Sequence, residues 1–185
     1  MKKNGFSLVE LVLVIVILGI VSVTAAPKFL TFQQSARISV IQGISGTMKS
    51  TITQVIAKSH LSGLSPIMAI PLSQADYLVD FPFGKVEVDW GSLCPESVGE
   101  EGAKLTMMDF LHLTGDENIK SLAGNRYTVV GYNFPFTDKR ELTADDLPIL
   151  PTGCYAIYDS FGRSSPEQCP SGGCQCKVNI EISGC

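Results

Sequence analysis

Residues 1–27 read MKKNGFSLVELVLVIVILGIVSVTAAP, and this segment sets the architecture of the chain. Two lysines precede Gly5, and an apolar run then extends from Phe6 to Ala26 with a single charge inside it, at Glu10. About 20 helical residues rise about 30 Å, so this run is long enough to cross a bilayer. A carboxylate near its start costs about 2.5–3.5 kcal/mol on insertion scales, and we expect assembly with another chain to compensate for it.

Two ordinary interpretations of this segment are a cleaved secretory signal and a simple signal anchor. Secretory signals have a shorter apolar region, followed by a cleavage site with small residues. Thr24-Ala25-Ala26 has the composition of such a site, but Pro27 directly after it is a poor context and Glu10 interrupts the apolar region. The simple anchor is therefore the stronger of these two alternatives.

This segment contains, in order, Gly5, Phe6, Glu10, the apolar run and Pro27. The series resembles the leader and N-terminus of type IV pilins and pseudopilins. The resemblance implies that a prepilin peptidase cuts between Gly5 and Phe6 and methylates the new amino group of Phe6. It also implies that Glu10 neutralises the N-terminal ammonium of a neighbouring subunit in a filament. Pro27 matches the family's helix-bending proline, and its missing N–H predicts a kink or local melting.

Further stretches are similar to the mannose-sensitive haemagglutinin (MSHA) pilins. They are residues 14–20, residues 24–30, Ser35-Ala36-Arg37, and a terminal strand pair from Cys154 to Cys185. The chain departs from these pilins in an inserted loop, residues 160–175, and in four extra cysteines, Cys94, Cys169, Cys174 and Cys176. The resemblance implies a self-polymerising filament subunit that uses an inner-membrane assembly platform and attaches to surfaces or glycans.

Charge indicates the orientation and excludes one class of partner. Lys2 and Lys3 favour a cytoplasmic leader by the positive-inside tendency, so the rest of the chain is expected in the periplasm and then on an extracellular pilus. Removing residues 1–5 moves the formal charge from −4 to about −6. Because no basic run follows Lys3, we expect no nucleic-acid binding.

All six cysteines lie beyond the apolar run, where an oxidising compartment favours disulfides. We predict a Cys154–Cys185 bond across the open ends of a terminal hairpin, closing about 32 residues and contributing roughly 3–4 kcal/mol. The partners of the other four cysteines stay open, although strain disfavours direct Cys174–Cys176 pairing. A zinc site at Cys169, Cys174 and Cys176 is the alternative, but its spacing lacks a paired CxxC arrangement.

The chain divides into a leader (1–5), a transmembrane and polymerisation helix (6–27), an amphipathic helix half (28–60) and a globular head (61–185). We predict one bent helix from Phe6 to about His60, ended by Gly63 and Pro66. Its second half has one apolar face, with polar residues largely opposite. That face comprises Ile38, Ile41, Met48, Ile52, Val55 and Ile56. Gly43 and Gly46 predict local flexibility or close packing.

Strands are predicted in the head from alternating and β-branched residues, over 86–90, 126–132, 154–158 and 177–182. A short helix is predicted within 104–113 and a turn at 114–116, and the last two strands are interpreted as a hairpin. One long helix followed by several strands indicates the α+β class. The pilin resemblance further implies an antiparallel sheet packed on the amphipathic half of the helix.

The sequence contains no recognisable catalytic motif, and we predict neither enzyme activity nor a cofactor. The acidic pairs Glu100-Glu101 and Asp145-Asp146 are expected on solvated loops, and His112 as a partly buried helix residue. Five aromatic residues are expected in the core rather than stacked on sugars: Trp90, Tyr127, Tyr132, Tyr155 and Tyr158. The alternatives to a pilus subunit are a type II secretion pseudopilin, a minor pilin, or a membrane-anchored periplasmic binding or enzymatic domain.

Overall fold

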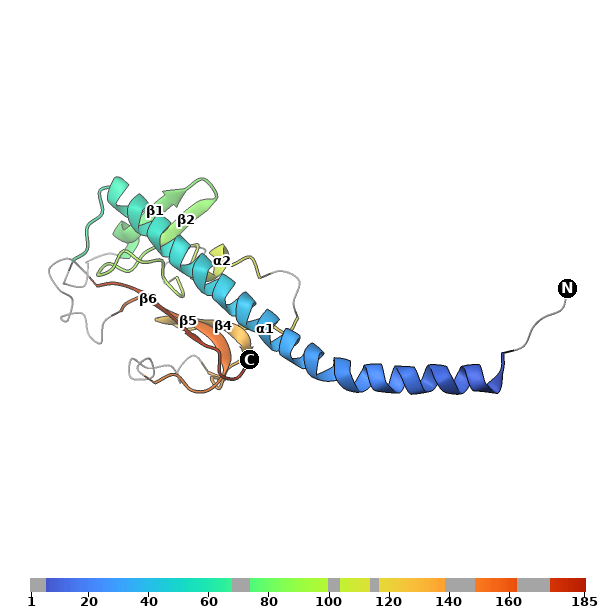
Figure 1. The fold of residues 1–185 in the computed structure, drawn as a ribbon. Helices are drawn as coiled ribbons and strands as arrows, with labels where there is room; N and C mark the ends of the chain where they lie inside the picture. The colour runs from blue at the N-terminus through green and yellow to red at the C-terminus, as the bar shows by residue number, and fades with distance from the viewer. Residues whose placement is uncertain (1–5, 68–73, 100–103, 114–116, 139–148, 163–173) are drawn as a thin grey trace. The chain divides into compact units, whose positions relative to one another are not determined.

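The structure is a computed structural model that describes residues 6–67, 74–99, 104–113, 117–138, 149–162 and 174–185. Its first element is the helix α1, Leu8–Leu61, which is 54 residues long (Figure 1). The predicted single long helix is therefore confirmed. Two compact units divide the chain within α1, Met1–Arg37 and Ile38–Cys185.

The described part of the first unit is mainly helix, and most of its side chains are apolar and exposed. Nearly all of its described side chains are exposed, and α1 is the one described helix long and apolar enough to span a membrane by length and composition. The few hydroxyls in the apolar run bond to their own helix: Ser22 Oγ donates to the Leu18 carbonyl at 2.7 Å, and Thr24 Oγ1 to the Val21 carbonyl at 3.0 Å. These groups therefore need no water in an apolar surrounding.

Pro27 lies inside α1, and helical backbone continues on both sides of it. Proline has no N–H to donate to the carbonyl four residues earlier, here Val23, so one hydrogen bond of the ladder is missing. The helix nevertheless does not melt at this position. The bend expected at Pro27 stays a prediction.

The second half of α1 buries one face. Ile41, Met48 and Val55 of the predicted apolar stripe are completely buried, and Ile38, Ile52 and Ile56 are half-buried. The buried face also includes Ile44, Ser45, Thr51 and Ser59, which the prediction omitted. Small hydroxyl residues are acceptable there because they can bond back to their own helix, as Ser59 Oγ does with the Val55 carbonyl at 2.8 Å.

The C-terminal end of α1 is closed by a Schellman motif. Gly63 N–H donates to the His60 carbonyl at 3.0 Å, and Leu64 N–H donates to the Ser59 carbonyl at 3.0 Å. Gly63 has φ of 84°, a left-handed conformation in which a side chain would be strained. The predicted stop at Gly63 is thus confirmed.

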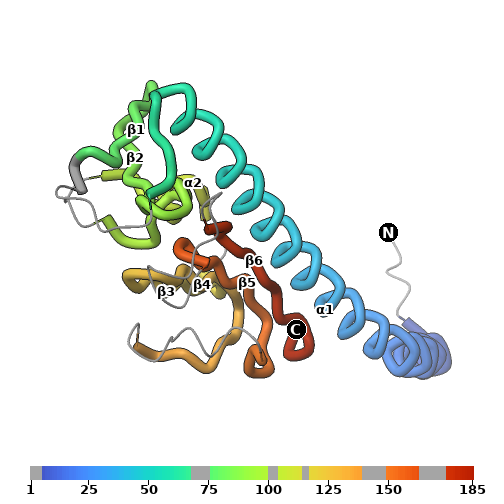
Figure 2. Tube along the Cα trace, turned by 90° about the vertical axis from the view of Figure 1, so that its left-hand side faces the viewer, coloured from blue at the N-terminus to red at the C-terminus, as the bar shows by residue number. Residues whose placement is uncertain are grey.

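The main sheet has four antiparallel strands in the order β3-β4-β5-β6 (Figure 2). They are β3 (Lys120–Ala123), β4 (Tyr127–Asn133), β5 (Cys154–Asp159) and β6 (Lys177–Glu181). Three of these strands and the terminal hairpin β5–β6 were predicted and are confirmed. The sequence of β3, Lys-Ser-Leu-Ala, contains no β-branched residue, so local propensity gave no sign of it.

A second sheet pairs β1 (Leu78–Phe81) with β2 (Gly84–Glu87). A 3₁₀ helix, Gln74–Tyr77, precedes it, and the short helix α2 (Met107–Phe110) lies within the predicted range 104–113. The strand predicted over 86–90 is too long. β2 ends at Glu87, and the chain then turns because Asp89 Oδ1 accepts the N–H groups of Gly91 and Ser92. The turn predicted at 114–116 lies outside the described residues.

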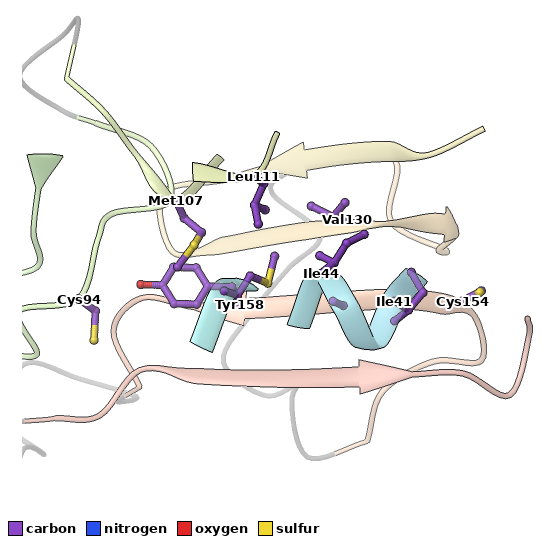
Figure 3. Packing of buried hydrophobic residues seen from close by; sticks show 10 residues of the cluster. Ile41, Ile44, Cys94, Met107, Leu111, Val130, Cys154 and Tyr158 are labelled. Carbon is purple, nitrogen blue, oxygen red and sulfur yellow. The ribbon is translucent and has the colours of Figure 1, made fainter. Parts of the chain in front are cut away.

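The core lies between the amphipathic half of α1 and the main sheet. Ile41, Ile44 and Met48 of the helix form one buried cluster with Val130 and Tyr158 of the sheet (Figure 3). Alternate strand residues on the opposite face form a separate cluster: Tyr127, Val129, Tyr155 and Ile157, with Phe136. Period-two alternation therefore divides the buried apolar residues of β4 and β5 between two cores. The predicted α+β architecture, a helix packed on an antiparallel sheet, is confirmed.

Two disulfides join distant parts of the second unit. Cys154 and Cys185, the pair expected from the sequence, are bonded across a separation of 31 residues, and Cys94 is bonded to Cys176 across 82 residues. Cys174 is also disulfide-bonded, while Cys169 lies outside the described residues. Zinc ligation needs cysteine thiolates, which Cys174 and Cys176 do not have in this oxidised fold. The zinc alternative is therefore wrong.

Loss of the Cys94–Cys176 bond is expected to destabilise the protein more than loss of Cys154–Cys185. The chain-entropy model gives about 4–5 kcal/mol for the longer loop and about 3–4 kcal/mol for the shorter one. We expect Cys94→Ser/Cys176→Ser to lower the thermal midpoint further than Cys154→Ser/Cys185→Ser, measured on full-length protein in detergent. Equal midpoints, or the reverse order, would contradict the entropic account.

Candidate functional site

The N-terminal end of α1 is built by a reciprocal capping box. Ser7 N–H donates to Glu10 Oε2 at 2.8 Å, and Glu10 N–H donates to Ser7 Oγ at 3.4 Å. Leu11 N–H donates to the Ser7 carbonyl at 3.2 Å, the first bond of the helical ladder. Ser7 is thus the N-cap and Glu10 is the third helical residue, which is why α1 begins at Leu8.

This geometry shows that part of the energetic cost of the Glu10 carboxylate is offset within its own helix. Glu10 lies in the first turn of α1, where unpaired backbone N–H groups give a partial positive charge. A carboxylate at this position gains about 0.3–1 kcal/mol from that charge. From the sequence we expected all the compensation to come from a second chain, an expectation that omits this local contribution. The motif Ser-x-x-Glu at residues 7–10 was the signal that would have revealed it.

Glu10 nevertheless has no nearby cation in its own helix. Among the described residues of the first unit, the nearest basic side chain in sequence is Lys28, which is 18 residues away, or about 27 Å along a helix. Phe6 precedes the box and is 83% exposed. In the helix turns that follow Glu10, exposed apolar side chains project from all sides of the helix. The site can therefore offer a carboxylate to a cation from outside the helix, and an apolar surface to whatever covers it.

The aromatic residues considered for sugar stacking lie mainly in the core, as predicted. Tyr127, Tyr155, Tyr158 and Trp90 are buried, and Tyr132 is half-buried. His112 differs from its prediction, because α2 ends at Phe110 and the imidazole is exposed. The acidic pairs Glu100-Glu101 and Asp145-Asp146 lie outside the described residues.

Exposed aromatic surface in the head comes from phenylalanines that the sequence did not single out. The rings of Phe81 and Phe83 lie 5.3 Å apart between centroids, and Phe110 meets both edge-on at 6.1 and 5.7 Å. Phe83 is 63% exposed at the turn between β1 and β2. Ring packing holds this cluster together, so the exposed ring of Phe83 is supported from two sides.

A buried polar cluster joins the loop after β2 to the main sheet. Three buried carboxylates, on Asp89, Glu96 and Asp159, lie near the Tyr158 hydroxyl in this cluster. Arg126 binds Asp159 through two parallel hydrogen bonds of 2.8 and 2.9 Å, a strong bidentate pair. Ser92 Oγ donates to the Ser160 carbonyl at 2.9 Å, which ties the loop to the end of β5. These contacts hold the loop in place, and the described residues contain no group of acidic, histidine or cysteine side chains arranged for a metal.

Tyr158 connects the same loop to the sheet. Its hydroxyl donates to the Pro95 carbonyl at 2.6 Å while the side chain is completely buried. Burial raises the pKa of Tyr158 well above its usual value, and the nearby carboxylates of Asp89, Glu96 and Asp159 raise it further. The phenol therefore acts as a neutral hydrogen-bond donor within the fold.

Comparison with known families identifies the first segment. Residues 1–26 match the prokaryotic N-terminal methylation motif. This motif indicates a type IV prepilin-like precursor that is processed by a peptidase, and it supports the pilin and pseudopilin family, whose members are structural and self-polymerising. With the apolar helix, it fits a membrane-anchored precursor. No curated protein and no solved structure matches the chain.

The raised pKa of Tyr158 predicts a loss of stability in alkali. A phenol whose folded pKa lies above its unfolded value of about 10 contributes stability that is complete below pH 10 and declines as the pH rises toward the folded pKa. We expect Tyr158→Phe to be less stable than wild type by about 1 kcal/mol at pH 7, because the bond to Pro95 is lost. Above pH 10 the difference should shrink, by up to about 1.4 kcal/mol per pH unit. Denaturant titrations of both proteins from pH 7 to pH 11.5 measure this, and parallel curves would contradict it.

Proposed function

We propose that this chain is a structural subunit of a type IV pilus of the MSHA type. It polymerises through α1 after prepilin peptidase processing, and the filament serves attachment to surfaces. The observation that carries the proposal is the methylation motif over residues 1–26, coupled to a helix that leaves its apolar surface exposed. An apolar helix with no protein around it needs a cover, which lipid supplies first and other subunits supply afterwards.

Processing falls between Gly5 and Phe6, and Phe6 carries the methylated amino group. The precursor sits in the bacterial inner membrane with the leader in the cytoplasm and the head in the periplasm, as Lys2 and Lys3 favour. Extraction by the inner-membrane assembly platform then moves the subunit into an extracellular filament. The disulfides of the head suit this route, since they persist in oxidising compartments.

Assembly depends on a charge pair between subunits. Once lipid and water are excluded, a carboxylate without a partner is strongly destabilising, whereas one that meets an ammonium recovers much of the cost. The capping box supplies a hydrogen bond to Glu10 but no counter-charge. The free amino group of Phe6 in an adjacent subunit supplies that charge, and the pairing fixes how far one subunit slides along the next.

The proposed attachment of the filament to surfaces is supported by the resemblance to the MSHA pilins. The stretches that carry the resemblance lie in α1 and in the terminal hairpin that the Cys154–Cys185 bond closes. The ligand is a glycan or another surface component. The Cys94–Cys176 bond and the loop over 160–175 depart from those pilins, so the ligand-binding surface is expected to be this chain's own.

The alternative function within the same family is a pseudopilin of a type II secretion system, or a minor pilin. The methylation motif supports these equally, since it covers the segment that such proteins share. Subunit abundance in sheared surface fractions distinguishes a major pilin from a pseudopilin or minor pilin, because a major pilin is the dominant protein in that material. A membrane-anchored periplasmic domain that never polymerises is the third candidate. Mass spectrometry of the mature N-terminus would support it by finding Met1 instead of methylated Phe6.

Glu10→Ala is expected to leave cleavage after Gly5 intact and to abolish or greatly reduce filaments, because the charge that receives the neighbouring amine is lost. Glu10→Gln is the matched control, since glutamine keeps an oxygen for the capping bond but has no charge. We expect it to fail in assembly as well. Electron microscopy and blots of sheared filaments measure the yield. A wild-type yield from Glu10→Gln would show that the charge has no role.

A further inference from the structure

The capping box gives the Glu10 carboxylate a defined orientation before any second subunit arrives. The bond from Ser7 N–H engages Oε2, and within the described residues Oε1 accepts no hydrogen bond. A glutamate side chain normally has several rotamers to lose on binding, and that loss weakens the complex. Here the first turn of the helix has already restricted the side chain.

We propose that Ser7 is a positioning residue for filament assembly: by capping α1 together with Glu10, it presents the free Oε1 of that carboxylate to the amino group of the incoming subunit. The inference rests on the proposed function, in which Glu10 pairs with the amine of Phe6. It adds that the pairing carboxylate is pre-organised by its own chain. Glu10 thus has two partners at once, a backbone N–H on one oxygen and an ammonium on the other, which a carboxylate accommodates.

Both bonds of the box lie outside the segment that processing removes. Cleavage between Gly5 and Phe6 leaves the Ser7 amide intact, so the donor to Oε2 persists in the mature protein. Near the apolar part of a membrane, water is scarce and unpaired N–H groups at the start of a helix are costly. Both N–H groups of the box are satisfied within the chain, which keeps the box closed until assembly.

Ser7→Ala tests the proposal, because it removes the hydroxyl that accepts the Glu10 N–H and leaves the amide of residue 7 as the sole contact that holds the carboxylate. We expect normal cleavage and a filament yield reduced by about fivefold, the equilibrium factor of an ordinary N-cap. Ser7→Thr keeps a hydroxyl and should restore most of the yield. Thr106→Ala is the matched control, since it removes the N-cap hydroxyl of the short helix α2 in the head, outside α1, and it should assemble as wild type.

Amide hydrogen exchange on the subunit in detergent separates positioning from simple fraying. We expect Ser7→Ala to speed exchange at Glu10 while amides from Val12 to Ile15 keep their wild-type protection. If protection along that segment falls together with filament yield, Ser7 is only a structural cap and the proposal is overturned. A wild-type yield from Ser7→Ala would overturn it too.

If Ser7→Ala blocks cleavage, amide hydrogen exchange still tests the proposal, because it can be measured on the precursor without any filament. In the wild-type precursor the Ser7 amide should exchange slowly, and in Glu10→Ala it should exchange rapidly. Rapid exchange in both would show that the box does not exist in the membrane-like state. The proposed function fails separately, if wild-type protein forms no filament or if Glu10→Gln assembles normally.

Discussion

The apolar surface of α1 is the constraint on which the rest of this molecule depends. Its first half is apolar on every side and lies exposed, so it requires lipid or other subunits as cover. Its second half buries a single face, through residues such as Ile41 and Met48, against the main sheet. One continuous helix thus has exposed apolar side chains along its first half and packs in the folded head along its second half.

The carboxylate of Glu10 illustrates how local and intermolecular stabilisation combine. Hydrogen bonding with Ser7 and the partial charge of the helix N-terminus offset part of the cost of an acid in an apolar run. Neither of them supplies a full counter-charge, which leaves a role for the amine of a second subunit. The local contribution explains how the helix tolerates Glu10, and in the proposed function the pairing explains why the acid is there.

The head depends on contacts that are distant in sequence. Three contacts hold the loop after β2 on the main sheet. They are the Cys94–Cys176 bond, the hydrogen bond from Tyr158 to Pro95 and the hydrogen bond from Ser92 to Ser160. Burial excludes Tyr158 and the nearby carboxylates of Asp89, Glu96 and Asp159 from external ligands. Solvent reaches the ring of Phe83, which is 63% exposed, while its neighbours Phe81 and Phe110 are half-buried.

The sequence by itself determined the methylation motif, the long helix, its stop at Gly63 and three strands of the main sheet, because each has a strong local signal in periodicity, composition or motif. Only the tertiary structure decided the Cys94–Cys176 pairing, the burial of Ser45 and Ser59, the edge strand β3 and the exposure of His112. These features arise from which surfaces meet in space. Hydrophobic burial and cross-strand pairing between residues far apart in the chain leave no periodic trace in the sequence.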